Sequence, residues 1–75
     1  MARADELKER AYNKTYSQLM DLMDAAVEQG NTSIAVSYKF FQENNELLKY
    51  VIDKAVEDGF FLRLYESRME IRLSE

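Results

Sequence analysis

The sequence lacks the residues that small proteins most often use for covalent or metal cross-links. Its 75 residues include no Cys, no His, no Pro and only two Gly. The absence of Cys excludes disulfides and thiolate zinc sites, and the absence of His removes the commonest metal ligand. A chain of this size buries only about 60% of the surface that its unfolded form exposes. Self-association is the remaining route to stability, so we expect a homo-oligomer.

The same absences limit the chemistry that the chain can perform. Without His or Cys there is no imidazole base and no thiol nucleophile, which leaves carboxylate pairs and lysines. Asp21, Asp24 and Glu28 are spaced to share one side of a helix. They form either a solvated acidic stripe, the commoner case, or a site for a divalent cation. We expect no enzyme, no cofactor and no metal.

Acidic residues outnumber basic ones by 14 to 10, which gives a net charge of −4. This balance argues against binding to duplex nucleic acid, which requires several phosphate-neutralising side chains. Uninterrupted apolar runs are too short to span a bilayer, so we expect no membrane partner. With 47% hydrophobic residues the chain is too apolar to be disordered. These properties predict a folded protein of the cytoplasm.

Changes in apolar period divide the chain into elements. Spacings of three and four residues predict a first helix over about 3–29, closed by Gly30. Alternation predicts a strand over about 32–39. Helical spacing then returns over about 43–58 and ends at Gly59, with Asn44 as the expected N-cap.

The last sixteen residues alternate again and predict a β-hairpin over about 60–73. If Glu66 and Ser67 form a two-residue turn, Arg63 lies opposite Glu70 as a favourable charge pair. The same register places six apolar side chains on one face: Phe60, Leu62, Leu64, Met69, Ile71 and Leu73. We therefore predict a single α+β domain over 1–75. Its order is a long helix, a strand, a second helix and a C-terminal hairpin. The strand and the hairpin form a three-stranded antiparallel sheet packed on the helices.

The opposite face of this hairpin combines arginines with aromatic rings. Such groups stack on flat ligands and form paired hydrogen bonds with anions. Either the side chains of this face only cover a half-exposed sheet or close a homo-oligomer, or the face binds a nucleotide or an acidic protein surface. The candidate binding residues are Lys39, Phe61, Arg63, Tyr65, Arg68 and Arg72.

The first helix is long for the sheet that it must cover. A helix over 3–29 is about 40 Å long, against about 20 Å for a six-residue strand. A second copy of the chain is expected to cover the surplus apolar stripe, because Tyr, Met and Leu suit the core of an interface. The expected interface residues are Tyr12, Tyr16, Leu19 and Met23.

The first helix ends in Glu28-Gln29-Gly30-Asn31-Thr32-Ser33, the second contains Glu46-Leu47-Leu48-Lys49-Tyr50-Val51, and Asp58-Gly59-Phe60-Phe61 leads into the closing hairpin. This order of segments resembles a group of small accessory proteins encoded by tailed bacteriophages. Many such proteins end in Trp, which this chain lacks. The resemblance implies a role in host takeover or counter-defence, in the cytoplasm of an infected bacterium. Three hypotheses follow: inhibition of a host protein by binding, sequestration of a nucleotide signal, and a structural or assembly role.

Overall fold

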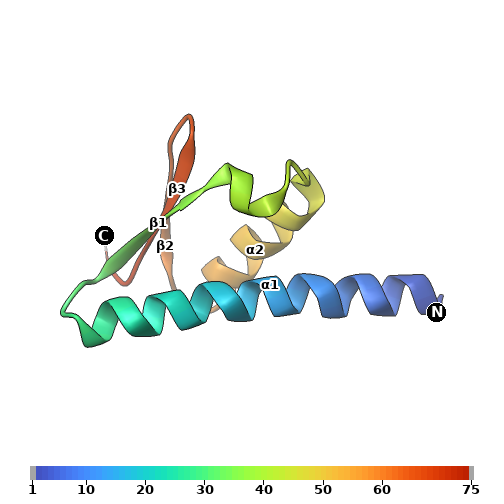
Figure 1. The fold of residues 1–75 in the computed structure, drawn as a ribbon, viewed down its shortest axis with the longest axis horizontal. Helices are drawn as coiled ribbons and strands as arrows, with labels where there is room; N and C mark the ends of the chain where they lie inside the picture. Colours follow the sequence, from blue (N-terminus) through green and yellow to red (C-terminus); the bar gives the residue numbers. More distant parts are fainter. Residues whose placement is uncertain (1, 75) are drawn as a thin grey trace.

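The N-terminal helix α1 (Arg3–Glu28) runs along the length of the molecule in the computed structural model, which describes residues 2–74 (Figure 1). The molecule measures 42 × 26 × 18 Å. Gly30, at φ +86°, ends the helix as expected. The Asn31 N–H donates to the Ala26 carbonyl and the Gly30 N–H to the Val27 carbonyl, the two bonds of a Schellman motif.

Strand β1 (Ser33–Ser37) follows and is shorter than the expected 32–39. Its end is a 3₁₀ helix, η1 (Tyr38–Phe41), which begins where the Ser37 hydroxyl accepts a hydrogen bond from the Lys39 N–H at 3.2 Å. Continued alternation would have buried Phe40. The 3₁₀ turn instead buries Phe41 and leaves Phe40 exposed, so the strand prediction is wrong beyond Ser37.

Helix α2 (Asn45–Glu57) begins two residues later than the expected 43 and ends one residue before 58. Gln42 and Glu43 precede it in the left-handed region, at φ 55° and 59°, so the chain cannot yet be helical there. Asn44 is the N-cap, as expected, and its Oδ1 accepts a hydrogen bond from the Leu47 N–H at 3.1 Å. Gly59, at φ +92°, ends the helix in a second Schellman motif.

The hairpin consists of β2 (Phe61–Leu64) and β3 (Arg68–Arg72) in the expected register. Arg63 is the Cα partner of Glu70, and Leu64 that of Met69. The Tyr65 N–H donates to the Arg68 carbonyl at 2.8 Å and encloses the two-residue turn. Strand β1 pairs antiparallel with β3, which gives the order β1-β3-β2 and makes β3 the central strand.

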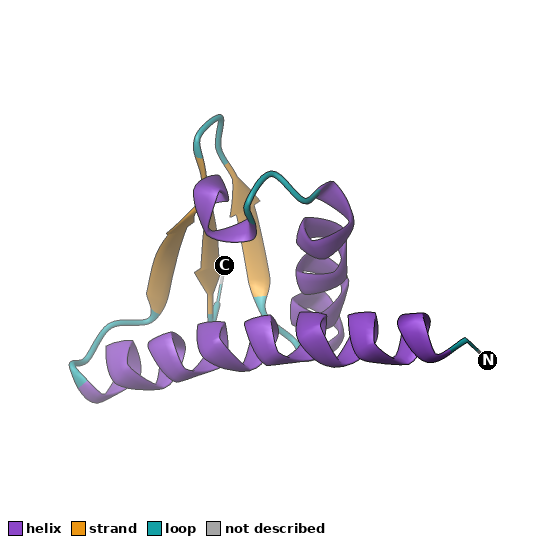
Figure 2. Cartoon of the chain, turned by 45° about the vertical axis from the view of Figure 1, so that its right-hand side comes forward, coloured by secondary structure: helices purple, strands orange, loops and turns teal. Residues whose placement is uncertain are grey.

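Both helices and η1 lie on the same side of the sheet (Figure 2). Met69 and Ile71 of β3 point toward them and are fully buried, and Val36 of β1 is nearly so. Leu19 from α1 and Val51 from α2 complete the centre of the core. The predicted fold class, a three-stranded antiparallel sheet packed on two helices, is confirmed.

The inward-facing side chains of the hairpin are not all covered. Leu64 is 58% exposed and Leu73 is 41% exposed, although both have the parity of the buried Met69 and Ile71. Leu64 lies next to the hairpin turn, which is far from α1 (Figure 1). The helices therefore cover the middle of the sheet and leave its ends open.

The four residues expected at an oligomer interface are packed within the single chain. Tyr16, Leu19 and Met23 belong to the buried core, and the Tyr12 ring packs against the Tyr50 ring with centroids 5.6 Å apart. The interface prediction is therefore wrong for Tyr16, Leu19 and Met23, whereas Tyr12 is only half-buried. It assumed that only the hairpin covers α1, whereas α2 also lies against that helix, for example where Tyr50 packs on Tyr12.

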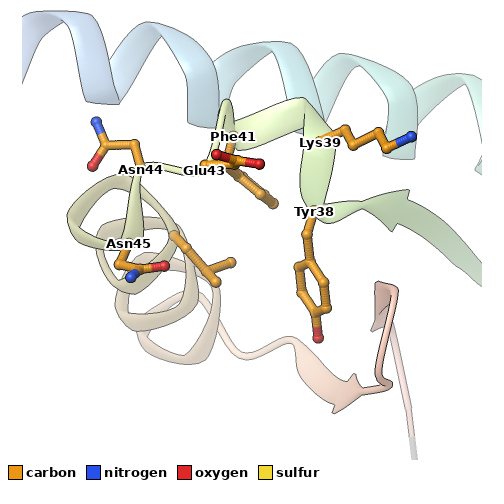
Figure 3. A pocket seen from close by; sticks show the side chains of 7 residues that line it. Tyr38, Lys39, Phe41, Glu43, Asn44 and Asn45 are labelled. Carbon is orange, nitrogen blue, oxygen red and sulfur yellow. The ribbon is translucent and has the colours of Figure 1, made fainter.

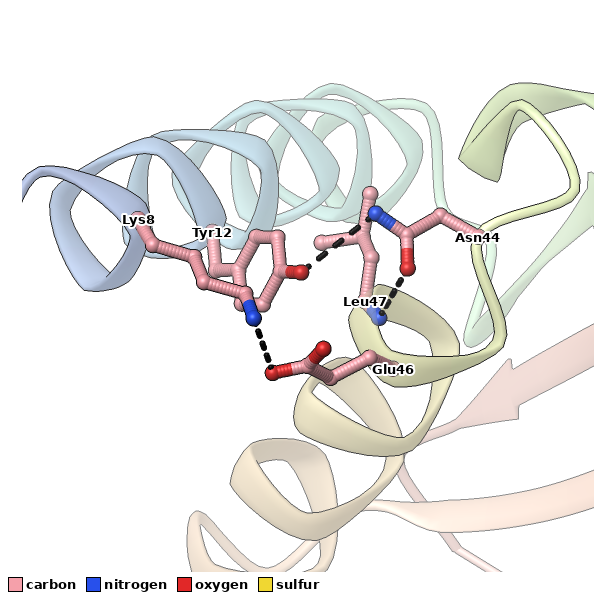
Figure 4. A network of polar contacts seen from close by, with 5 residues as sticks. All are labelled: Lys8, Tyr12, Asn44, Glu46 and Leu47. Atoms are coloured by element: carbon pink, nitrogen blue, oxygen red, sulfur yellow. Dashed lines mark hydrogen bonds and ion pairs between the residues drawn. The ribbon is translucent and has the colours of Figure 1, made fainter. Parts of the chain in front are cut away.

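Polar contacts hold the start of α2 against α1 (Figure 4). The Asn44 side chain donates to the Tyr12 hydroxyl at 3.4 Å while it caps α2. The Lys8 ammonium lies 2.7 Å from a Glu46 carboxylate oxygen. The hydrogen bond and charge of Glu46 raise the pKa of Lys8. Because both partners of this ion pair are exposed, the cap is the stronger contribution to stability.

At the other end of α2, the Tyr16 hydroxyl donates to a carboxylate oxygen of Asp58 at 2.5 Å. Burial raises the pKa of Tyr16, and the hydrogen bond and negative charge of Asp58 add to the shift. The folded state therefore favours the neutral phenol.

We predict that Asn44→Ala lowers the free energy of unfolding by about 1 kcal/mol, because the first turn of α2 loses its capping acceptor. Urea denaturation measures this loss. Asn45→Ala is the matched control, since Asn45 is exposed and lies inside the helix. Equal stability of the two variants would show that the cap does not stabilise the fold.

We predict that the stability of the protein falls above pH 10, the ordinary pKa of Tyr, because an unfolded Tyr16 ionises there while the folded one does not. Tyr16→Phe removes this part of the alkaline loss and costs about 1 kcal/mol near neutral pH. Urea denaturation from pH 7 to 11 measures both effects. The pKa of Lys8 is also raised, but Lys8 is present in both proteins and its contribution cancels in the comparison. Identical alkaline slopes would contradict the role given to Tyr16.

Candidate binding face

The side of the sheet opposite the helices has no covering layer among residues 2–74 (Figure 2). Because side chains alternate along a strand, the neighbours of the buried Met69 and Ile71, which are Arg68, Glu70 and Arg72, point to this side. Their cross-strand partners point the same way. We call this surface the outer face. It consists of Ser33, Ala35 and Ser37 from β1, Phe61 and Arg63 from β2, and Arg68, Glu70 and Arg72 from β3, with Tyr65 beside the turn.

The structure brings five of the six candidate binding residues onto this one face. Phe61 is the Cα partner of Arg72, and Tyr65 lies opposite Arg68. The sixth residue, Lys39, is not on the first strand as expected but in η1. It lines an open hollow of about 580 Å³ together with Ser37 and Arg68, at the end of the sheet near the hairpin turn. Lys39 therefore borders the outer face.

The outer face carries three arginines but one glutamate, so it is locally positive although the protein is acidic. The expected ion pair between Arg63 and Glu70 is not formed. Glu70 instead lies 3.7 Å from the Nε atom of Arg72, two residues along the same strand. No carboxylate of the described chain lies within 4.0 Å of the Arg63 guanidinium. Arg63 is therefore available to an acidic partner.

The Arg68 guanidinium lies over the Tyr65 ring, 4.4 Å from its centroid. Stacking of this kind orders a long side chain and keeps its N–H groups free to donate. The Tyr38 hydroxyl donates to the Tyr65 carbonyl at 2.6 Å and ties the end of β2 to η1. The strand expected over about 32–39 would have included Tyr38, which instead begins η1. The available signal was its hydroxyl, since a half-buried tyrosine needs a hydrogen-bond partner.

A second candidate is a cavity of about 410 Å³ at the start of α2, lined from η1, the following loop and the first turns of the helix (Figure 3). One of the two left-handed residues, Glu43, lines it, and strain of this kind is concentrated at functional sites. Two of its polar side chains are nevertheless engaged elsewhere. Asn44 caps α2 and Tyr38 binds the Tyr65 carbonyl, while Lys39, Glu43 and Asn45 are exposed. We therefore favour the outer face.

Two further expectations bear on the choice of site. Within residues 2–74 no group of three acidic side chains lies close enough to hold a metal ion, so Asp21, Asp24 and Glu28 do not form a cation site there. In the same part of the chain, no helix has the length and apolar character needed to cross a bilayer.

The chain matches no protein-family model, no curated protein and no solved structure. The function must therefore be inferred from the residues of the outer face themselves.

We predict that Arg72→Ala changes the free energy of unfolding by less than about 0.5 kcal/mol, because its side chain is on the outer face. Ile71→Val, one residue away on the buried face, should cost about 1 kcal/mol. Chemical denaturation of both variants measures the difference. The reverse order of stabilities would mean that β3 presents its other face to the helices.

Proposed function

We propose that the protein is a non-catalytic binding protein whose outer face docks on an acidic protein surface. The observation that carries this proposal is the placement of Arg63, Arg68 and Arg72 on a sheet face that no helix covers. In a protein of net charge −4, three arginines on one small surface are a strong local bias. Paired N–H donors of guanidinium groups suit carboxylates, and arginines recur at the energetic centres of interfaces.

The shape and composition of the outer face favour a protein partner over a small ligand. Phe61 is 42% exposed beside the arginines, and an aromatic side chain among charged ones is typical of protein interfaces. The side chains of Ser33, Ala35 and Ser37 are small, so little side-chain volume covers the backbone of β1 on this face. A partner can therefore approach the backbone of β1 while its acidic groups reach β3.

The resemblance to accessory proteins of tailed phages supports a more specific version of this proposal. In that version the partner is a host protein of an infected bacterium, for instance a defence factor, and binding in the cytoplasm inhibits it. Inhibition by occlusion requires no catalytic group, in keeping with the absence of His and Cys.

One observation favours sequestration of a nucleotide as the alternative. Phe61, Arg63 and Arg72 line an open hollow of about 340 Å³ at one end of the face. An aromatic ring beside two guanidinium groups has the chemistry to stack on a base and bind its phosphates.

We predict that replacing Arg63, Arg68 and Arg72 together by Gln abolishes capture of the partner from bacterial lysate by the immobilised protein. The reason is that the outer face loses the charges that bind acidic groups. Capture by the unmodified protein should weaken as salt is raised, because exposed ion pairs are screened. Mass spectrometry identifies the captured protein, and circular dichroism checks that the variant is folded.

The matched control replaces Arg10, Lys14 and Lys49 by Gln, which removes the same charge from exposed positions on the helices. This variant should capture the partner normally. Equal loss in both variants would reduce the effect to net charge and refute the outer face as the binding site. A panel of nucleotides tests the alternative, because a ligand at 100 times its dissociation constant stabilises the fold by about 2.7 kcal/mol. Stabilisation of this size by a nucleotide would indicate that the outer face binds that nucleotide and not an acidic protein.

A further inference from the structure

The outer edge of β1 is an unpaired sheet edge. The Leu73 N–H donates to the Thr32 carbonyl, and the Tyr38 N–H donates to the Ser67 carbonyl. Antiparallel pairing alternates, so the even-numbered residues of β1 bond to β3. Ser33, Ala35 and Ser37 therefore direct their backbone N–H and C=O groups away from β3. In the described part of the chain, no other strand pairs with β1.

This edge carries none of the features that usually prevent pairing with another strand. Natural edge strands are blocked by charged side chains, Pro or bulges. The sequence of β1 is Ser-Ile-Ala-Val-Ser, without any of these. The opposite edge strand, β2, differs because it contains Arg63. Of the two edges of the sheet, the one formed by β1 is therefore the better template for an added strand.

The order of side chains in β1 indicates what that added strand is. The segment is nearly symmetric about Ala35, with serine at both ends and β-branched Ile34 and Val36 between. An antiparallel copy centred on Ala35 places Ser33 opposite the partner's Ser37 and Ile34 opposite the partner's Val36. Every unpaired backbone group of Ser33, Ala35 and Ser37 then meets a group of the second copy.

We propose that two copies of the chain join through β1 in this register and form a continuous six-stranded sheet with a two-fold axis at Ala35. The contact is isologous, as in most homodimers. The apolar Ile34, which is half-buried in the single chain, gains the partner's Val36 on the same face as the core. The arrangement does not depend on the function proposed for the outer face.

Charges do not oppose this pairing. The β3 strands of the two copies, which carry the arginines nearest to the axis, are three strand spacings apart, about 14 Å. Charges at that separation on an exposed surface are largely screened at physiological salt. The dimer also supplies the additional burial that a 75-residue chain without cross-links needs.

Sedimentation equilibrium tests the dimer. We expect a mass of twice 8.8 kDa for the unmodified protein at micromolar concentration. Ala35→Pro removes an N–H that points away from β3, which an edge strand tolerates, and should raise the dissociation constant about tenfold or more. A monomer at every concentration, or a folded Ala35→Pro variant that dimerises normally, would overturn the proposal.

Disulfide formation tests the register and does not depend on the Pro variant folding. The natural chain has no Cys, so each introduced thiol is unique. Cα atoms of directly opposed residues in the proposed pair are about 5.5 Å apart, within the range of a disulfide. Ala35→Cys should therefore cross-link to itself under mild oxidation.

Ser33→Cys is the control for register. In the proposed dimer the two copies of residue 33 are offset by four residues along the strand, about 14 Å. The Ser33→Cys variant should not cross-link alone but should do so when mixed with Ser37→Cys. Phe61→Cys is the control for the other edge and should remain unlinked. Cross-linking of Phe61→Cys in place of Ala35→Cys would assign the contact to β2, and none at either position would refute pairing through the sheet.

Discussion

Pairing of β3 with both β1 and β2 is the constraint on which the other features of the molecule depend. It inserts the last strand of the chain between β1 and β2, which are separated by 23 residues of sequence. Met69 and Ile71 can then be fully buried, because each has a neighbour on both sides and the helices above. The same pairing places Arg68, Glu70 and Arg72 in the middle of the opposite face. The core and the candidate binding face are thus two sides of one five-residue strand.

Local features of this fold could be derived from the sequence. The two glycines mark the ends of the helices, since only a residue without a Cβ easily adopts the positive φ found there. Asn44 could be identified as a cap from its side chain. The hairpin register followed from alternation around Glu66 and Ser67. In each case the decisive interaction lies within a few residues, so nearby side chains carry the whole signal.

Features that depend on the third dimension were missed. Alternation continues through Phe40, and nothing in that pattern shows that the Ser37 hydroxyl begins a 3₁₀ turn. The packing of α2 against α1 was also not apparent from the sequence. Without it, Tyr16 appeared as surplus apolar surface, whereas it is buried and bonded to Asp58. The five candidate binding residues on the hairpin were found because their placement needs only the period of two in a strand.

The two open surfaces of the sheet differ in the kind of partner that they favour. The outer face is charged and aromatic, and affinity there depends on side chains and therefore on the identity of the partner. The edge of β1 is small and uncharged, and affinity there depends on backbone groups that any strand can satisfy. An edge of that kind needs a specific occupant if aggregation is to be avoided.

Symmetry about Ala35 provides such an occupant, since two identical edges close on each other and leave no β1 edge free. The resulting sheet would carry two outer faces in a fixed orientation. A partner with two acidic sites at the matching separation would bind both, and the second contact would form at the high effective concentration set by the rigid sheet. A chain of modest size can thus bind tightly through individually weak, exposed ion pairs.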